Sequence, residues 1–111
     1  MNLADYEEEI HITAQEKGWW DRERSFGDLI SLIHSEVSEA LEEYRAGHTP
    51  WEIYFNTDKP DKPEGVPIEL ADCLIRILDM VKFYNIDLEK ALQLKMTYNH
   101  GRSYRHGDKV L

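Results

Sequence analysis

The stretch PIELADCLIRILDMV, residues 67–81, decides the fold class of this 111-residue chain. Pro67 is well placed as the first residue of a helix, because proline fits the first helical turn. Apolar side chains cover nearly the whole surface of that helix, and its charged residues share one strip of roughly 80°. These charged residues are Glu69, Asp72, Arg76 and Asp79. We therefore expect a core helix, buried nearly all round, whose charged strip faces a polar cavity, another chain or water.

Apolar residues at helical spacing predict three further helices, at residues 3–17, 26–46 and 88–100. Ser25 and Asp87 are expected to cap the second and the last of these. The segment 48–66 contains three prolines and is too long for a simple turn. Part of it is expected to pack as a short helical turn. The whole chain, residues 1–111, is predicted to be a single all-α domain resembling a four-helix bundle.

The composition limits the kinds of partner. A formal net charge of −9 argues against duplex nucleic acid and against an anionic membrane, because both need a basic surface. No segment has the features of a signal peptide or the length of a membrane span. Cys73 is the single cysteine, so no disulfide within the chain can form. We expect a cytoplasmic protein.

Two pairs of acidic residues lie on neighbouring predicted helices. Glu36 and Glu39 are three residues apart, as are Glu69 and Asp72, so each pair projects from one helix face. Glu36 falls inside the apolar stripe of its helix, which is unusual for a solvated charge. If the helices pack antiparallel, four carboxylates converge, and such a cluster needs a cation or raised pKa values. Oxygen-only ligands suit Mg²⁺, or Mn²⁺, better than zinc or a di-iron centre.

The competing interpretation makes the same acids ordinary surface charge. Arg76 follows Asp72 by four residues and precedes Asp79 by three, so it can neutralise both on a solvent-facing strip. The position of Glu36 and the paired spacing favour the metal cluster.

The sequence resembles the MazG-like, all-alpha nucleoside triphosphate pyrophosphohydrolases. That family is marked by Glu-x-x-Glu, an interval, and Glu-x-x-Asp, which read here as EVSE at 36–39 and ELAD at 69–72. The wider text EKGWWD, GVPIELADCLIRILD and KMTYNHGRSYRHG also resembles this family, so the similarity covers most of the chain. The resemblance implies a MazG-type fold and an oligomer.

The resemblance also implies an activity and its residues. Magnesium is expected on Glu36, Glu39, Glu69 and Asp72. Water then attacks the α-phosphorus of a nucleoside triphosphate, releasing a nucleoside or deoxynucleoside monophosphate and pyrophosphate, with Glu36 or Glu39 as the catalytic base. Ser35 stands where some relatives have a further glutamate, and the interval before Glu69 is on the long side.

Residues for substrate binding are expected at two places. Lys95, Asn99 and Arg102 follow i, i+4, i+7 spacing and resemble the phosphate-contacting segment of the family, although a helix C-terminus favours cations by itself. Arg105, His106 and Lys109 would extend this basic patch. Trp20 is expected to stack on the base, the alternative being that it closes one end of the bundle.

The expected partners are the nucleotide and a second copy of the chain. The apolar arc of the core helix is too broad for short neighbours to cover, so we expect a homodimer or a dimer of dimers. Two other functions stay open at this stage. One is a phosphoribosyl-ATP pyrophosphohydrolase-type activity, and the other is a non-catalytic helical interaction module with an acidic surface strip.

Overall fold

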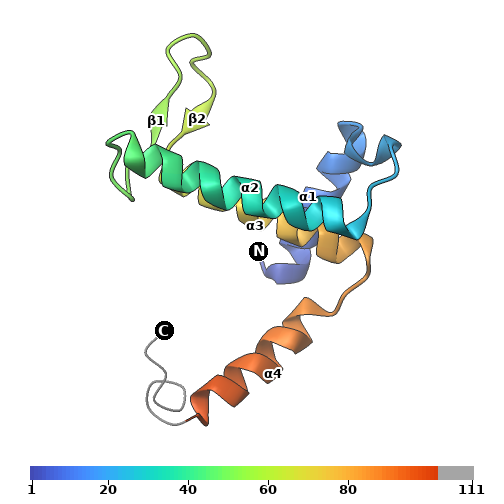
Figure 1. The fold of residues 1–111 in the computed structure, drawn as a ribbon. Coiled ribbons are helices and arrows are strands. Elements are labelled where there is room, and N and C mark those ends of the chain that lie inside the picture. The colour runs from blue at the N-terminus through green and yellow to red at the C-terminus, as the bar shows by residue number, and fades with distance from the viewer. Residues whose placement is uncertain (103–111) are drawn as a thin grey trace.

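A computed structural model describes residues 1–102 and shows a mostly helical chain (Figure 1). The elements follow in the order α1 (Leu3–Glu16), the 3₁₀ turn η1 (Trp19–Asp21), α2 (Phe26–Arg45), β1 (Tyr54–Phe55), β2 (Pro63–Glu64), α3 (Val66–Phe83) and α4 (Leu88–His100). The all-α prediction is confirmed apart from the small β-hairpin. The four predicted helices are all present, with ends close to those expected.

Side-chain caps define where two of the helices begin. The Ser25 side chain accepts a 3.0 Å hydrogen bond from the Asp28 amide at the start of α2. The Asp87 carboxylate accepts one of 3.0 Å from the Lys90 amide at the start of α4. Both predicted caps are confirmed, and each satisfies an amide that lacks a partner within its helix. Within residues 1–102, no helix has the length and apolar character needed to cross a membrane.

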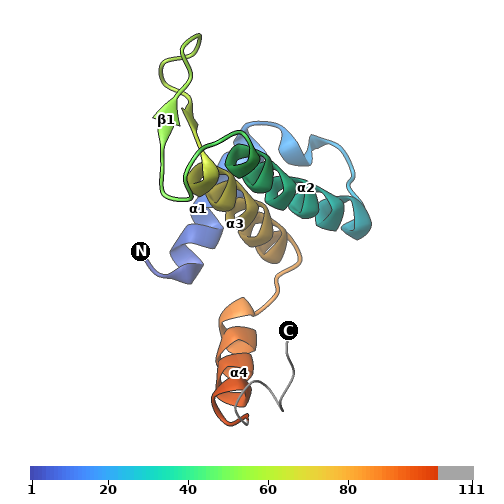
Figure 2. The same cartoon turned by 60° about the vertical axis from the view of Figure 1, so that its left-hand side comes forward.

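The helices α2 and α3 lie side by side and antiparallel, and α1 crosses α3 (Figures 1 and 2). Their contacts form the core of the described chain. The buried apolar residues are Leu29, Ala40, Val66, Leu78, Met80 and Val81. Leu78 is the most deeply buried, with 2% of its surface exposed. The antiparallel arrangement of α2 and α3 is the one that brings the two acidic pairs together.

The prediction that the core helix is buried nearly all round is wrong for the single chain. Leu70 and Leu74 are each 53% exposed, and Ile75 is 44% exposed. The reason is geometric, because α1 and α2 cover only part of the α3 circumference. Residues 1–102 therefore leave an apolar face on α3 exposed.

The fourth helix does not close a bundle. In both views α4 extends away from the packed α1, α2 and α3 (Figures 1 and 2). No residue of α4 is buried, and Leu94, Met96 and Tyr98 are exposed by 64%, 65% and 61%. Within one chain the fold is thus a three-helix core with a projecting helix, rather than a four-helix bundle.

The connection between α2 and α3 is a hairpin, so the predicted short helical turn is wrong. Strands β1 and β2 pair antiparallel, and the hairpin projects from one end of the α2–α3 pair (Figure 1). Gly65, with φ +123°, turns the chain from β2 into α3. A side chain there would collide with the Glu52 carbonyl oxygen, so glycine is required on two grounds. Trp51 remains 79% exposed and does not help this segment to pack.

Candidate metal centre

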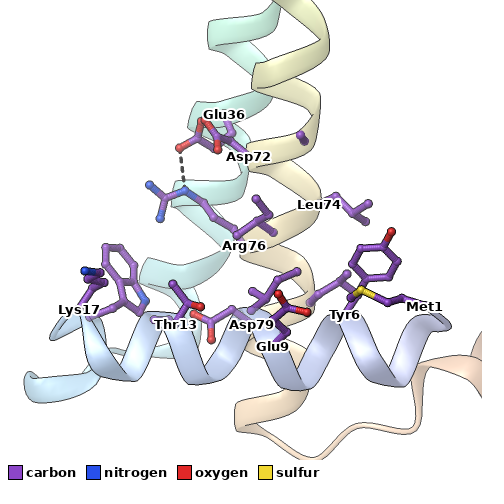
Figure 3. Close-up of a pocket in the computed structure, with 16 residues that line it drawn as sticks. Met1, Tyr6, Glu9, Thr13, Lys17, Glu36, Asp72, Leu74, Arg76 and Asp79 are labelled. Atoms are coloured by element: carbon purple, nitrogen blue, oxygen red, sulfur yellow. Dashed lines mark hydrogen bonds and ion pairs between the residues drawn. The ribbon is translucent and has the colours of Figure 1, made fainter. Parts of the chain in front are cut away.

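The contact between α2 and α3 brings acidic side chains from both helices into one cluster. Glu36, Glu69 and Asp72 each offer a carboxylate oxygen, and these three oxygens lie within 4.8 Å of one another. Figure 3 shows the carboxylates of Glu36 and Asp72 close together where the two helices meet. Helix α3 contributes Glu69 and Asp72, which are three residues apart and share a helix face as the sequence predicts, and α2 contributes Glu36.

Glu36 is the buried member of this cluster, with 7% of its surface exposed. Its Oε1 accepts a 2.7 Å hydrogen bond from Nε of Arg76, across the α2–α3 interface (Figure 3). Its Oε2 is also buried and has no hydrogen-bond partner among residues 1–102, and the same holds for Oε2 of Glu69. Buried carboxylate oxygens without a donor are costly, and a cation between the members of this cluster would offset that cost.

Glu39 borders the cluster and affects its protonation. Burial, hydrogen bonding to Glu39 and repulsion by it together raise the pKa of Glu69 to about 7, with burial the largest cause. Burial also raises the pKa of Asp72, and the negative charge of Glu36 adds to that rise. Both shifts express the same crowding of acids, which a bound dication would relieve.

The donor set fits a hard dication. All of the oxygens come from carboxylates, and neither a histidine nor the Cys73 thiol belongs to the group of residues that could hold a metal within residues 1–102. Magnesium and manganese prefer such oxygen ligands, whereas structural zinc sites use cysteine and histidine. Glu36, Glu69 and Asp72 are the residues placed to hold the ion, and Glu39 stands beside them.

The partner of Arg76 differs from the one considered at the sequence level. The surface-charge interpretation paired Arg76 with Asp72 and Asp79 along one helix, whereas its hydrogen bond goes to Glu36 on the other. This contact depends on how α2 and α3 are aligned along each other, and helical spacing within one helix does not determine that alignment. The only sequence signal was the place of Arg76 on the acidic strip.

Asp79 belongs to a separate buried network. It accepts a 2.6 Å hydrogen bond from His11 Nδ1 and 3.1 Å bonds from the Trp20 indole. The Trp20 ring stacks on Phe83, with ring centroids 4.0 Å apart and an interplanar angle of 3°. Trp20 thus packs where α1, η1 and α3 meet, which agrees with the alternative of a residue closing one end of the bundle. His11 is satisfied by its bond to Asp79, and His34 is exposed.

A cavity of about 290 Å³, lined mostly by acidic residues, adjoins the cluster. It is lined by Glu39, Glu42, Glu43, Ala46, His48, Tyr54 and Glu69. The Tyr54 hydroxyl donates to Glu43 at 2.8 Å, and this bond raises the pKa of Tyr54 to about 12. The Tyr54 ring also stacks on His48, with centroids 4.4 Å apart. These contacts fix the hairpin to the C-terminal end of α2, beside the acids.

A larger cavity of about 780 Å³ lies between α1 and α3. Its lining includes the cluster residues Glu36 and Asp72, together with Arg76 (Figure 3). Most of the remaining wall is apolar and includes Tyr6 and Leu74. The volume falls in the range of sites for small organic ligands, roughly 300–1,000 Å³. A ligand in this cavity would therefore reach the acidic cluster.

The predicted phosphate-binding residues lie elsewhere in the chain. Lys95 and Asn99 belong to α4 and Arg102 follows it, and α4 stands apart from α2 and α3, the helices that carry the acidic cluster (Figure 2). Lys95 Nζ lies 5.1 Å from the centroid of the Tyr98 ring, and the Arg102 guanidinium carbon lies 5.3 Å from it. The structure does not bring these residues of the same chain to the acids. The further basic positions Arg105, His106 and Lys109 lie outside the described residues.

The cluster therefore combines three convergent carboxylates, a neighbouring fourth and one arginine, at the edge of a cavity large enough for a nucleotide. This geometry is observed in this chain and is not inferred from a related protein. Comparisons with protein families, with curated proteins and with solved structures find no match for the chain.

Proposed function

We propose that the protein is a magnesium-dependent nucleoside triphosphate pyrophosphohydrolase. The observation that carries the proposal is the buried Oε2 of Glu36, which has no partner in the described part of the chain and lies in a cluster with Glu69 and Asp72. The resemblance of both acidic pairs to the MazG-like signature supplies the reaction type. The products would be a nucleoside or deoxynucleoside monophosphate and pyrophosphate.

Magnesium, or manganese, would be held by Glu36, Glu69 and Asp72, with Glu39 completing the set. When bound, it would supply neutralisation of the triphosphate charge and orientation of the α-phosphate. This is needed because the protein is itself acidic, with a formal net charge of −9. Without a cation, the four carboxylates would repel the substrate.

Glu39 is the better candidate for the catalytic base. Glu36 is buried and its Oε1 is held by Arg76, whereas Glu39 is exposed at the edge of the cluster. In the proposed step, Glu39 accepts a proton from water as the water oxygen forms a bond to the α-phosphorus. The bond between the α-phosphorus and the bridging oxygen breaks, and pyrophosphate leaves with the electron pair.

The test is a panel of ribo- and deoxynucleoside triphosphates with magnesium. The products are separated to distinguish monophosphate plus pyrophosphate from diphosphate plus phosphate. Glu36→Gln and Glu69→Gln proteins are run beside the wild type. Glu42→Gln is the matched control, because Glu42 is an exposed glutamate of α2 paired with Arg45. We expect pyrophosphate release by the wild type and the control, and its loss in both cluster variants.

Two other results would replace the proposal. Cleavage of phosphoribosyl-ATP alone would assign the related phosphoribosyl-ATP pyrophosphohydrolase activity. Absence of turnover, with a thermal stability that magnesium does not change, would leave a non-catalytic interaction module whose acidic strip meets a basic partner.

We also propose that the working unit is a homodimer or a dimer of dimers. Among residues 1–102, the α3 face of Leu70, Leu74 and Ile75 is exposed, and no residue of α4 is buried. Association would cover this apolar surface and could bring Lys95, Asn99 and Arg102 of one copy to the cluster of another. We infer a cytoplasmic location, where the single Cys73 stays reduced.

A further inference from the structure

Two arginines pack on one indole ring beside the acidic cluster. The guanidinium carbon of Arg24 lies 3.5 Å from the centroid of the Trp19 ring, and that of Arg76 lies 5.0 Å from it. Arg24 precedes α2 in the chain, Trp19 begins η1, and Arg76 lies in α3. Three separate segments thus bring two positive charges together in an otherwise acidic protein.

Each guanidinium is fixed in place through its Nε. The Arg24 Nε donates a 2.8 Å hydrogen bond to the Trp19 carbonyl oxygen, and the Arg76 Nε donates one of 2.7 Å to Glu36 Oε1. Among residues 1–102, no acceptor is found for the terminal Nη groups of either arginine. Both side chains are partly buried. The two arginines are therefore immobilised while most of their hydrogen-bond donors remain available.

We propose that Arg24 and Arg76 form a clamp for the two terminal phosphates of the substrate, which leave as pyrophosphate. This inference rests on the proposed function. It assigns the residues that bind the two terminal phosphates. Planar guanidinium groups bind phosphate oxygens through paired hydrogen bonds. Two of them, already held over a ring, lose little conformational entropy on binding.

Arg76 lines the cavity at the cluster, and Arg24 packs on the Trp19 ring, which lines the same cavity. Arg76 contacts Glu36 directly, so its terminal donors lie next to the place where the cluster would hold the α-phosphate. Arg76, Trp19 and the cluster residues Glu36 and Asp72 line the same cavity. A polyphosphate chain leaving the cluster therefore meets Arg76 first. The predicted Lys95 and Arg102 of the same chain are not placed there, because α4 stands apart (Figures 1 and 2).

Arg76 has a second effect that the test must separate from phosphate binding. Its removal leaves Glu36 buried without its partner, which alters the cluster itself. Within residues 1–102, Arg24 makes no hydrogen bond or ion pair with the cluster and shares only Trp19 with Arg76, so Arg24 variants report on the clamp alone.

The experiment measures binding of pyrophosphate by calorimetry, in the presence of magnesium, to the complete chain. The variants are Arg24→Gln, Arg76→Gln and Arg76→Lys, and the control is Arg45→Gln, an exposed arginine of α2 paired with Glu42. Magnesium binding without an anion is titrated for each protein. We expect Arg24→Gln to weaken pyrophosphate binding about tenfold while its magnesium affinity stays unchanged. Arg76→Lys keeps the positive charge but loses the planar guanidinium that makes paired hydrogen bonds to phosphate oxygens. It should therefore recover only part of the affinity lost in Arg76→Gln.

The outcomes separate the clamp from the proposed function. If the wild type releases pyrophosphate from nucleotides but Arg24→Gln binds pyrophosphate as tightly as the control, the clamp is wrong and the function stands. If the wild type binds pyrophosphate through both arginines but hydrolyses no nucleotide, the clamp stands and the function is wrong. A wild type that neither binds pyrophosphate nor hydrolyses nucleotides overturns both. A KM increase in Arg24→Gln with little change in kcat would support the clamp by an independent measurement.

Discussion

Asp79 in α3 accepts a 2.6 Å hydrogen bond from Nδ1 of His11 in α1, a residue 68 positions earlier in the chain. Asp79 is 6% exposed and also receives the Trp20 indole hydrogen, so one carboxylate joins α1, η1 and α3. The sequence placed Asp79 on a charged strip with the catalytic candidates. In the structure, Asp79 instead links α1 and η1 to α3 through its hydrogen bonds with His11 and Trp20.

Replacing Asp79 should therefore destabilise the fold. Asp79→Ala leaves two partly buried donors, on His11 and Trp20, without an acceptor, and we expect it to cost about 3 kcal/mol of unfolding free energy. Asp79→Asn should cost less, because its amide oxygen can still accept from Trp20. Urea unfolding measures the loss of stability in both variants. Asp5→Ala is unsuitable as a control, because the Asp5 side chain takes part in the cap of α1. Exposed Asp61→Ala serves better, and a similar loss there would contradict the prediction.

Magnesium should stabilise the folded protein through the acidic cluster. A ligand that binds only the folded state at 100 times its Kd adds about 2.7 kcal/mol. We expect a magnesium-dependent rise in the thermal midpoint of the wild type and of Glu42→Gln. Glu36→Gln and Asp72→Asn should lose most of this rise, since each removes a charged ligand. An equal rise in all four proteins would place the ion elsewhere.

The raised pKa of Glu69 predicts how the metal-free protein responds to pH. Its folded pKa of about 7 exceeds its ordinary value of 4.5, because burial and neighbouring acids favour the protonated form. Protonated Glu69 therefore contributes stability that is fully present below pH 4.5 and is lost as the pH rises through 7. Magnesium competes with this proton, so its affinity should fall about tenfold from pH 8 to pH 6. Calorimetry in buffers of different ionisation enthalpy should detect the released proton, and its absence would contradict the assignment.

Tyr54 should ionise unusually late. Its hydrogen bond to Glu43 raises its pKa to about 12, from an ordinary value of 10. The contribution of this bond is present below pH 10 and is lost as the pH rises through 12. NMR of tyrosine ring carbons should show one late titration, which Glu43→Gln returns towards pH 10. Glu42→Gln should leave it unchanged, because Glu42 pairs with Arg45 rather than with Tyr54.

The uncovered face of α3 should make the protein self-associate. Light scattering of the wild type at micromolar concentration is expected to give at least twice the mass of one chain. Leu74→Lys puts a charge on this face and should shift the protein towards the monomer. Trp51→Lys is the matched control, because Trp51 is exposed on the α2–α3 connection rather than on the α3 face. A monomeric wild type would remove the basis for the dimer.

Helix positions and the acidic pairs could be predicted because both depend on neighbours along the chain. Apolar spacing located all four helices, and Ser25 and Asp87 cap the helices that they precede. The three-residue spacing of each acidic pair places both of its members on one helix face. The sequence did not reveal the hairpin, whose pairing joins Tyr54 to Glu64 across ten positions.

What only the tertiary structure decided is which side chains meet between elements. Glu36 pairs with Arg76, Asp79 with His11, and two arginines share the Trp19 ring, because helices pack in one register and at one crossing. Helical periodicity fixes the face on which a residue lies, but it carries no information on the partner opposite that face. The sequence by itself therefore determined a helical protein with two acidic pairs, whereas packing determined that one of these acids is buried and held by an arginine.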